Sequence, residues 1–254
     1  MNSNDSKYIG IDPTSGNQDF GYAVLDGNLN LVALAEADLD ELIEFLSAQG
    51  EAVVAVNAPG DVNQGLVKQM RTDGQASPGR AVRGTDMRLV EYELRERGIS
   101  VAGTPSRVEY CPAWMQLGFN LYHKLTQVGY QPFKPDGTGC RLFETHPFAC
   151  FVVLSDGIPF PKPTLEGRLQ RQLLLNDKGL RITDGMDFFE EITRFKLMKG
   201  ILPQDVLYTP EQLDVLVAAY TAWLAVNRPE EVTRVGDQDE GQMILPAREL
   251  KLKY

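Results

Sequence analysis

Residues 52–56, Ala-Val-Val-Ala-Val, are apolar at every position, and this run constrains the fold more than any other feature of the chain. An uninterrupted apolar run of this length is typical of a strand that is covered on both faces of its sheet. The preceding residues 39–49 place Leu42 and Leu46 on one side of an amphipathic helix. A helix directly before the strand favours a parallel crossover over a hairpin. The sequence therefore predicts a central parallel strand in an α/β sheet.

Three further strands are predicted upstream of that helix. Residues 8–12 and 21–25 have strand composition, and Asp26-Gly27 predicts a tight turn into a third strand at residues 29–35. An antiparallel meander of three strands, a crossover helix and a parallel strand make up the first half of the ribonuclease-H-like architecture. The predicted fold class is therefore α/β, with a ribonuclease-H-like mixed sheet, flanking helices and large helical insertions.

Later elements are less regular. Residues 58–83 are rich in Gly, Asn, Gln, Ser and Pro, which predicts a long surface loop. The chain then predicts helices at residues 86–96, 113–127, 165–175 and 188–198, and a short strand at 141–144. Thr209-Pro210-Glu211-Gln212 has the composition of a helix start, with Thr as N-cap and Pro at the first helical position. The residues after about 234 are not assigned to an element.

Length and composition indicate one elaborated domain. The chain has 254 residues, of which 43% are hydrophobic, and we expect a single domain over 1–254 with insertions at about 58–139 and 156–208. The polar N-terminus lacks the pattern of a secretion signal, and no apolar run reaches membrane-spanning length. The sequence therefore predicts a cytoplasmic protein without a membrane segment.

A formal charge of −10 limits the partners of the chain. Affinity for duplex nucleic acid that does not depend on sequence comes mainly from Lys and Arg neutralising phosphates, so the charge argues against broad binding of this kind. A local basic patch is still compatible with nucleic acid or a nucleotide as partner. The oligomeric state is not determined by the sequence.

Four polar residues lie at places where the ends of strands and a late helix can meet. Asp12, Asn57 and Glu144 close predicted strands, and Asp214 lies near the start of the late helix. Ligands of open α/β sheets bind at the carboxyl ends of strands, and converging carboxylates need a cation between them. Each residue also has a local explanation, such as an Asp-Pro turn at Asp12 or the helix dipole at Asp214. Only the combination favours a site.

The chain resembles the uncharacterised family called domain of unknown function 429, whose members are usually described as predicted ribonuclease-H-like nucleases. The matching stretches occur in the order of the family: Ile9-Gly10-Ile11-Asp12, Val54-Ala55-Val56-Asn57-Ala58-Pro59, Arg83 with Asp86 and Arg88, Glu144-Thr145-His146-Pro147, Lys162 with Gly167-Arg168 and Arg171, and Leu213-Asp214-Val215-Leu216-Val217-Ala218-Ala219. Each is short, but the ordered set is specific enough to carry the resemblance.

The resemblance implies Asp12, Glu144 and Asp214 as acidic site residues. Hard oxygen ligands of this kind suit Mg²⁺ or Mn²⁺. The position of Asn57 is usually Asp in the family, so this chain departs from the pattern by one negative charge. We expect either one tightly held metal ion or a loss of hydrolytic activity.

Several basic residues are candidates for contact with a phosphate. Arg168 and Arg171 have the i,i+3 spacing that would let both guanidinium groups contact one phosphate, with Lys162 shortly before them. We add Arg83 as a fourth candidate for phosphate contact. Such a basic stripe is otherwise a solvated helix face, and Arg83 with its neighbours could instead form a local ion-pair network.

The leading functional hypothesis is a metal-dependent nuclease or phosphodiesterase that hydrolyses a nucleic acid or nucleotide. An alternative is a nucleotide-binding or phosphoryl-transfer module of the sugar-kinase or actin-like type, which shares this sheet topology. A third is a non-catalytic interaction protein that has lost activity, for which Asn57 is the main argument. The substrate and the pathway are not determined by the sequence.

Overall fold

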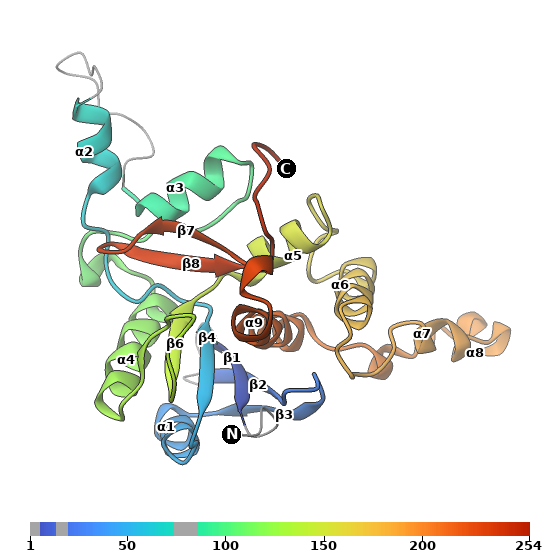
Figure 1. Ribbon diagram of the computed structural model, residues 1–254. Helices are drawn as coiled ribbons and strands as arrows, with labels where there is room; N and C mark the ends of the chain where they lie inside the picture. The colour runs from blue at the N-terminus through green and yellow to red at the C-terminus, as the bar shows by residue number, and fades with distance from the viewer. Residues whose placement is uncertain (1–5, 14–19, 74–85) are drawn as a thin grey trace.

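The computed structural model describes residues 6–13, 20–73 and 86–254, and the side chains of residues 71–73 are not described (Figure 1). Its strands are β1 (Lys7–Pro13), β2 (Phe20–Leu25), β3 (Leu31–Ala37), β4 (Ala52–Val56), β5 (Gln131–Pro132), β6 (Arg141–Glu144), β7 (Thr233–Asp237) and β8 (Gly241–Leu245). They form one mixed sheet in the order β3-β2-β1-β4-β6-β8-β7, with β5 paired to β6. The mixed α/β architecture of the ribonuclease-H-like kind is thereby confirmed.

The first half of the sheet follows the predicted order of elements. β1, β2 and β3 pair antiparallel in sequence, while β4 lies parallel to β1 with Ile11 opposite Val56. β6 then lies parallel to β4, with Val56 opposite Glu144. The carboxyl ends of β1, β4 and β6 therefore lie at the same edge of the sheet, because parallel strands end together.

The helices are α1 (Leu39–Ser47), α2 (Leu66–Asp73), α3 (Leu89–Glu96), α4 (Ala113–Gln127), α5 (Pro147–Leu154), α6 (Leu165–Asp177), α7 (Asp187–Glu190), α8 (Arg194–Met198) and α9 (Pro210–Asn227). The start of α9 is the one predicted from the sequence. Thr209 accepts a hydrogen bond from the backbone of Gln212, and the Gln212 side chain accepts one from the backbone of Thr209.

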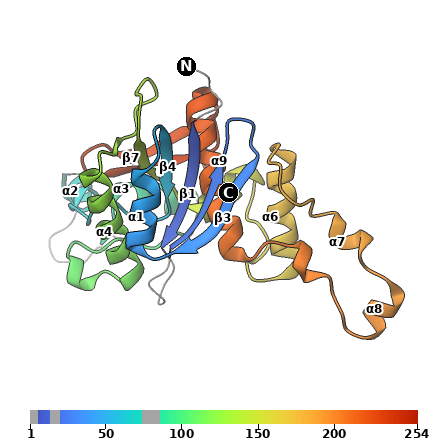
Figure 2. The same cartoon turned by 90° about the horizontal axis from the view of Figure 1, so that it is seen from below.

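Helices cover both faces of the sheet, as Figures 1 and 2 show. On one face, α9 packs with α5 on side chains that include Tyr8, Ala55 and Phe143. On the other face, α1 and α4 pack on side chains that include Ile11 and Leu142. Successive side chains of a strand point to opposite faces, so the two cores together fix the direction of every side chain along β1, β4 and β6.

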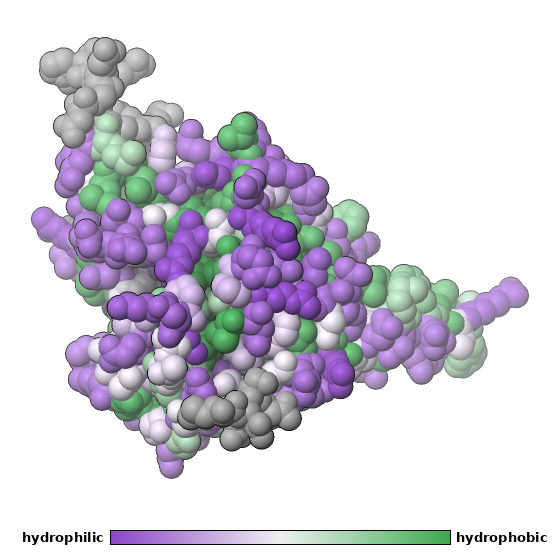
Figure 3. Space-filling view, viewed as in Figure 1, coloured by the Kyte–Doolittle hydropathy of each residue, from purple (hydrophilic) through white to green (hydrophobic). Residues whose placement is uncertain are grey.

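Three parts of the chain differ from the predictions. The predicted loop at 58–83 contains the helix α2, while residues 74–85 lie outside the described part. The predicted helix at 188–198 is two short helices, α7 and α8. They project from the body as an arm that carries exposed apolar side chains, among them Phe195 and Met198 (Figures 2 and 3). α5 and the hairpin of β7 and β8 were not predicted.

The described part of the chain contains no helix that is both long enough and apolar enough to cross a membrane. All three cysteines are free, and Cys111 and Cys150 are buried.

Candidate functional site

Asp12 and Asn57 meet at the carboxyl ends of two neighbouring strands. Asp12 lies in the last part of β1, and Asn57 follows β4 directly, with its backbone N–H donating to the carbonyl of Ile11 at 2.8 Å. Both side chains have the strand parity that faces α9. Asn57 Nδ2 donates a hydrogen bond to Asp12 Oδ1 at 2.8 Å. The two residues therefore form one polar unit under the first turns of α9.

Gly10 brings α9 close enough for Asp214 to join this unit. A Cβ atom on Gly10 would lie 2.1 Å from the carbonyl oxygen of Val215 and 2.4 Å from the nitrogen of Ala219. Only glycine permits this approach of helix and strand. Asp214 precedes Val215 in α9, and its side chain is 8% exposed. It lies near Asp12, because Asp12 is only two residues after Gly10 in β1.

Lys162 supplies the positive charge nearest to these carboxylates. Its Nζ lies 2.5 Å from Asp214 Oδ2 and 3.9 Å from Glu211 Oε1, and its side chain is 41% exposed. The turn that carries it packs tightly against α6, because a Cβ atom on Gly167 would lie 2.0 Å from the carbonyl oxygen of Pro161. Lys162 thus reaches the site from a turn whose position is set by backbone packing.

Burial outweighs the nearby positive charge at both Asp12 and Asp214. Burial and the negative charge of Asp214 raise the pKa of Asp12 to about 7, although the hydrogen bond from Asn57 and the charge of Lys162 oppose the shift. Burial also raises the pKa of Asp214, despite the opposing charges of Lys162 and Arg171. Both carboxylates are therefore harder to ionise in the folded protein than in water.

Arg171 and His146 complete the surroundings of the pair. Arg171 is 1% exposed, and its Nη1 donates to the carbonyls of Phe160 at 2.8 Å and Gly167 at 2.9 Å. Its charge acts on Asp214 from inside the protein. His146 accepts the backbone N–H of Ala149 at its Nδ1, as the N-cap of α5. Burial lowers the pKa of His146 to about 4, so this ring is neutral at pH 7.

The structure places Glu144 away from Asp12 and Asp214. Leu142 belongs to the core beneath α4, whereas Phe143 belongs to the core beneath α9. Glu144 has the parity of Leu142 and therefore points toward the α4 face. Two hydrogen bonds join its carboxylate to Arg88, at 2.8 Å from Nη1 and 2.5 Å from Nη2. The three predicted carboxylates therefore do not converge, since Glu144 lies apart from Asp12 and Asp214.

Arg88, which the sequence places in a possible local ion-pair network with Arg83 and Asp86, is instead the partner of Glu144. It is 1% exposed and also donates from Nε to Glu91 at 2.9 Å. Glu91 in turn accepts hydrogen bonds from both the backbone N–H and the hydroxyl of Thr104. Burial raises the pKa of Glu144, and the two hydrogen bonds from Arg88 oppose this shift. The i,i+3 spacing of Arg88 and Glu91 was a visible signal for this network.

The predicted phosphate clamp of Arg168 and Arg171 does not form, because the two guanidinium groups have different partners. Arg168 donates to backbone carbonyls of Tyr208 at 2.8 Å, Leu207 at 2.5 Å and Gln204 at 3.2 Å. It therefore ties α6 to the segment before α9. Arg83, the fourth predicted phosphate contact, lies outside the described residues.

The donor set suits one divalent cation better than two. Within the described ranges, no three side chains among His, Cys, Asp and Glu are placed to hold a metal ion together. Asp12 and Asp214 offer two carboxylates and Asn57 a neutral carboxamide. Mg²⁺ is commonly bound by one or two carboxylates together with phosphates of the substrate, so this pair fits a single ion of that kind.

Comparison with known proteins gives one family. Neither the curated proteins nor the solved structures yield a significant match. The profile of the family described as "Protein of unknown function (DUF429)" matches residues 10–241. This range includes Asp12, Asn57, Lys162 and Asp214 and covers most of the chain. The chain therefore belongs to the DUF429 family.

Proposed function

We propose that this chain is a metal-dependent nuclease or phosphodiesterase that acts at Asp12 and Asp214. The observation that carries the proposal is the pair of buried carboxylates at the carboxyl edge of the sheet, with the pKa of Asp12 raised to about 7. Buried carboxylates that lack sufficient positive charge are costly unless a cation joins them. Their placement also matches the edge at which open α/β sheets bind ligands.

Asp12 and Asp214 would hold the ion, and the carboxamide oxygen of Asn57 is available beside them. A divalent ion held there supplies Lewis-acid chemistry at a phosphate. The missing third carboxylate favours a weak site that the phosphate of the substrate completes. Metal affinity should accordingly be higher in the presence of a phosphodiester than in its absence.

Lys162 would orient the phosphate. Its side chain is partly exposed, and its turn sits beside the carboxylates, so the ammonium group can contact an anion without leaving the site. Arg171 is more deeply buried, and two carbonyl groups already hold its Nη1. We therefore assign Arg171 to stabilising Asp214 and Lys162 to binding substrate.

The test combines metal binding with hydrolysis. Mn²⁺ should raise the melting temperature of the wild-type protein, because a ligand at 100 times its dissociation constant stabilises by about 2.7 kcal/mol. Asp12→Asn and Asp214→Asn should abolish that rise and the Mn²⁺-dependent cleavage of bis(4-nitrophenyl) phosphate and a single-stranded oligonucleotide. Asp40→Asn removes an 89% exposed carboxylate and is the matched control.

Asn57→Asp sharpens this test. The substitution adds a carboxylate beside Asp12 at nearly constant volume, so it should tighten Mn²⁺ binding and strengthen cleavage. Tighter binding without cleavage would leave a metal-binding module and count against hydrolysis. An equal Mn²⁺ response in wild type and Asp12→Asn would show that the ion binds elsewhere.

A further inference from the structure

A cavity lies on the other side of β6 from the Asp12 and Asp214 pair. It has a volume of about 540 Å³, is open to solvent on one side, and is lined by α4, β6, the hairpin of β7 and β8, and residues 60 and 61 after β4. Cavities of roughly 300–1,000 Å³ enclose ligands of the size of drugs and nucleotides. None of Asp12, Asn57, Lys162 and Asp214 belongs to its described lining. The cavity is therefore distinct from the Asp12 and Asp214 site.

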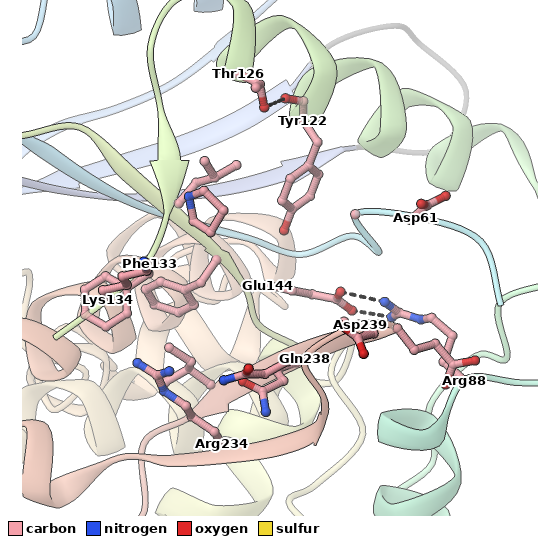
Figure 4. A pocket seen from close by; sticks show the side chains of 18 residues that line it. Asp61, Arg88, Tyr122, Thr126, Phe133, Lys134, Glu144, Arg234, Gln238 and Asp239 are labelled. Atoms are coloured by element: carbon pink, nitrogen blue, oxygen red, sulfur yellow. Dashed lines mark hydrogen bonds and ion pairs between the residues drawn. The ribbon is translucent and has the colours of Figure 1, made fainter. Parts of the chain in front are cut away.

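Two cations on one wall of the cavity have no acidic partner among the described residues. Lys134 follows β5 and Arg234 lies in β7, and both side chains are exposed. The guanidinium carbon of Arg234 lies 5.8 Å from the centroid of the Phe133 ring, which holds it along the wall. Figure 4 shows Arg234 reaching into the cavity from β7. This wall is suited to an anion.

The buried acids of the lining are already compensated by the protein. Glu144 is joined to Arg88, as the dashed lines in Figure 4 show. Glu240 is 2% exposed and accepts backbone N–H groups from Gln64 at 2.9 Å and Leu89 at 2.6 Å. These two carboxylates therefore do not cancel the charge of Lys134 and Arg234.

Tyr122 contributes a buried hydroxyl without a partner. Its oxygen makes no hydrogen bond within the described part of the chain, although the atom is buried. In Figure 4 the ring descends from α4 and directs this hydroxyl into the cavity. Burial and the charge of Glu144 raise the pKa of Tyr122, so the group stays protonated and can both donate and accept. A polar ligand atom would satisfy it.

The end of the cavity opposite the cations is acidic. Asp61 and Asp239 are exposed lining residues, and Figure 4 places them near Arg88, across from Phe133 and Lys134. Exposed carboxylates accept hydrogen bonds from amino groups. The cavity thus offers cations for an anionic end, a hydroxyl in the middle and acceptors for an amino group at the far end.

We infer that this cavity binds a nucleoside monophosphate that carries an exocyclic amine, with its phosphate at Lys134 and Arg234 and a polar sugar or base atom at the Tyr122 hydroxyl. The size of the cavity, the uncompensated cations and the acceptors at the opposite end are each matched by such a ligand. The inference does not depend on hydrolysis at Asp12 and Asp214.

The test is calorimetric titration of the full chain with adenosine 5′-monophosphate. The double variant Lys134→Gln/Arg234→Gln should weaken binding by at least about tenfold, because charge-assisted hydrogen bonds to the phosphate are lost. Lys199→Gln/Arg194→Gln removes the same two charges on and just beyond α8 and should bind as wild type does. Tyr122→Phe removes one hydrogen bond and should weaken binding about threefold or more, whereas exposed Tyr110→Phe should not.

Three results would overturn the inference. One is no binding of the nucleotide by a wild-type protein that is folded by circular dichroism. Another is equal affinity of wild type and the Lys134/Arg234 variant. A third is inorganic phosphate binding as tightly as the nucleotide, which would reduce the cavity to an anion site. Asp12→Asn should retain nucleotide binding, so that failure of the proposed hydrolysis and failure of this inference remain distinguishable.

Discussion

Two pairs of buried carboxylates lie near the carboxyl edge of the sheet, and they differ in how a cation is bonded to them. Glu144 and Glu91 share Arg88, which is 1% exposed and bonded to both. Asp12 and Asp214 share Lys162, whose side chain is 41% exposed and bonded to Asp214 alone at short distance. The first network is closed within the protein. In the second, no cation among the described residues is bonded to Asp12, whose side-chain partner is the neutral Asn57, and this difference distinguishes a structural acid from a candidate site acid.

The largest expected effect is loss of the closed network. Arg88→Met should lower the free energy of unfolding by about 3–5 kcal/mol near neutral pH, because two buried carboxylates lose their cation. Urea denaturation measures this change. Arg107→Met is the control, since Arg107 is exposed and pairs with Glu109 only at 3.8 Å, and it should change stability by less than about 0.5 kcal/mol. Similar costs for both variants would mean that Glu144 is not held by Arg88.

For the Asp12 and Asp214 pair, removing a charged group should raise the free energy of unfolding instead of lowering it. The pKa of Asp12 rises from 3.8 to about 7 on folding, so the folded state keeps a proton that the unfolded state loses over this window, and stability falls as pH rises through it. Asp12→Asn is neutral and retains the oxygen that accepts from Asn57. It should raise the free energy of unfolding by about 2–4 kcal/mol near pH 8 and by little near pH 4.

Urea denaturation of Asp12→Asn and wild type between pH 4 and pH 8 measures whether the stability difference grows as pH rises. Asp40→Asn should change the free energy of unfolding by less than about 0.5 kcal/mol, since that carboxylate is exposed. A stability difference for Asp12→Asn that does not vary with pH would mean that Asp12 and Asp214 are compensated as fully as Glu144 and Glu91. The contrast between the two regions would then disappear.

The smallest expected effect concerns Arg168. Its hydrogen bonds to the segment at 204–208 give it a structural role, so Arg168→Gln should lower the free energy of unfolding by about 1–2 kcal/mol and leave metal-dependent hydrolysis unchanged. Arg181→Gln removes a contact of 3.4 Å to Asn30 and serves as control. Reduced hydrolysis at unchanged stability would instead support the phosphate clamp predicted from the spacing.

Local sequence signals predicted much of the fold. The apolar run at β4, the Asp-Gly turn after β2 and the Thr-Pro-Glu-Gln start of α9 act over a few residues, and the structure contains each of them. The hairpin of β7 and β8 was missed because its strands are short and its Gly236 and Gly241 adopt positive φ angles that interrupt the strand pattern. α5 was not predicted because its residues are almost all apolar, so the sequence has no amphipathic pattern of helical period.

The candidate site was also predicted in part from local sequence and decided in part by tertiary packing. The sequence by itself determined that Asp12, Asn57 and Glu144 close strands and that Asp214 lies early in a capped helix. Only the tertiary structure decided which of them meet, because the register of β6 turns Glu144 toward α4 while Gly10 admits α9 beside Asp12. It also decided which cation each carboxylate is bonded to, since Arg88 and Lys162 reach Glu144 and Asp214 from distant segments. Side-chain direction and long-range ion pairs depend on packing between elements, which no local pattern encodes.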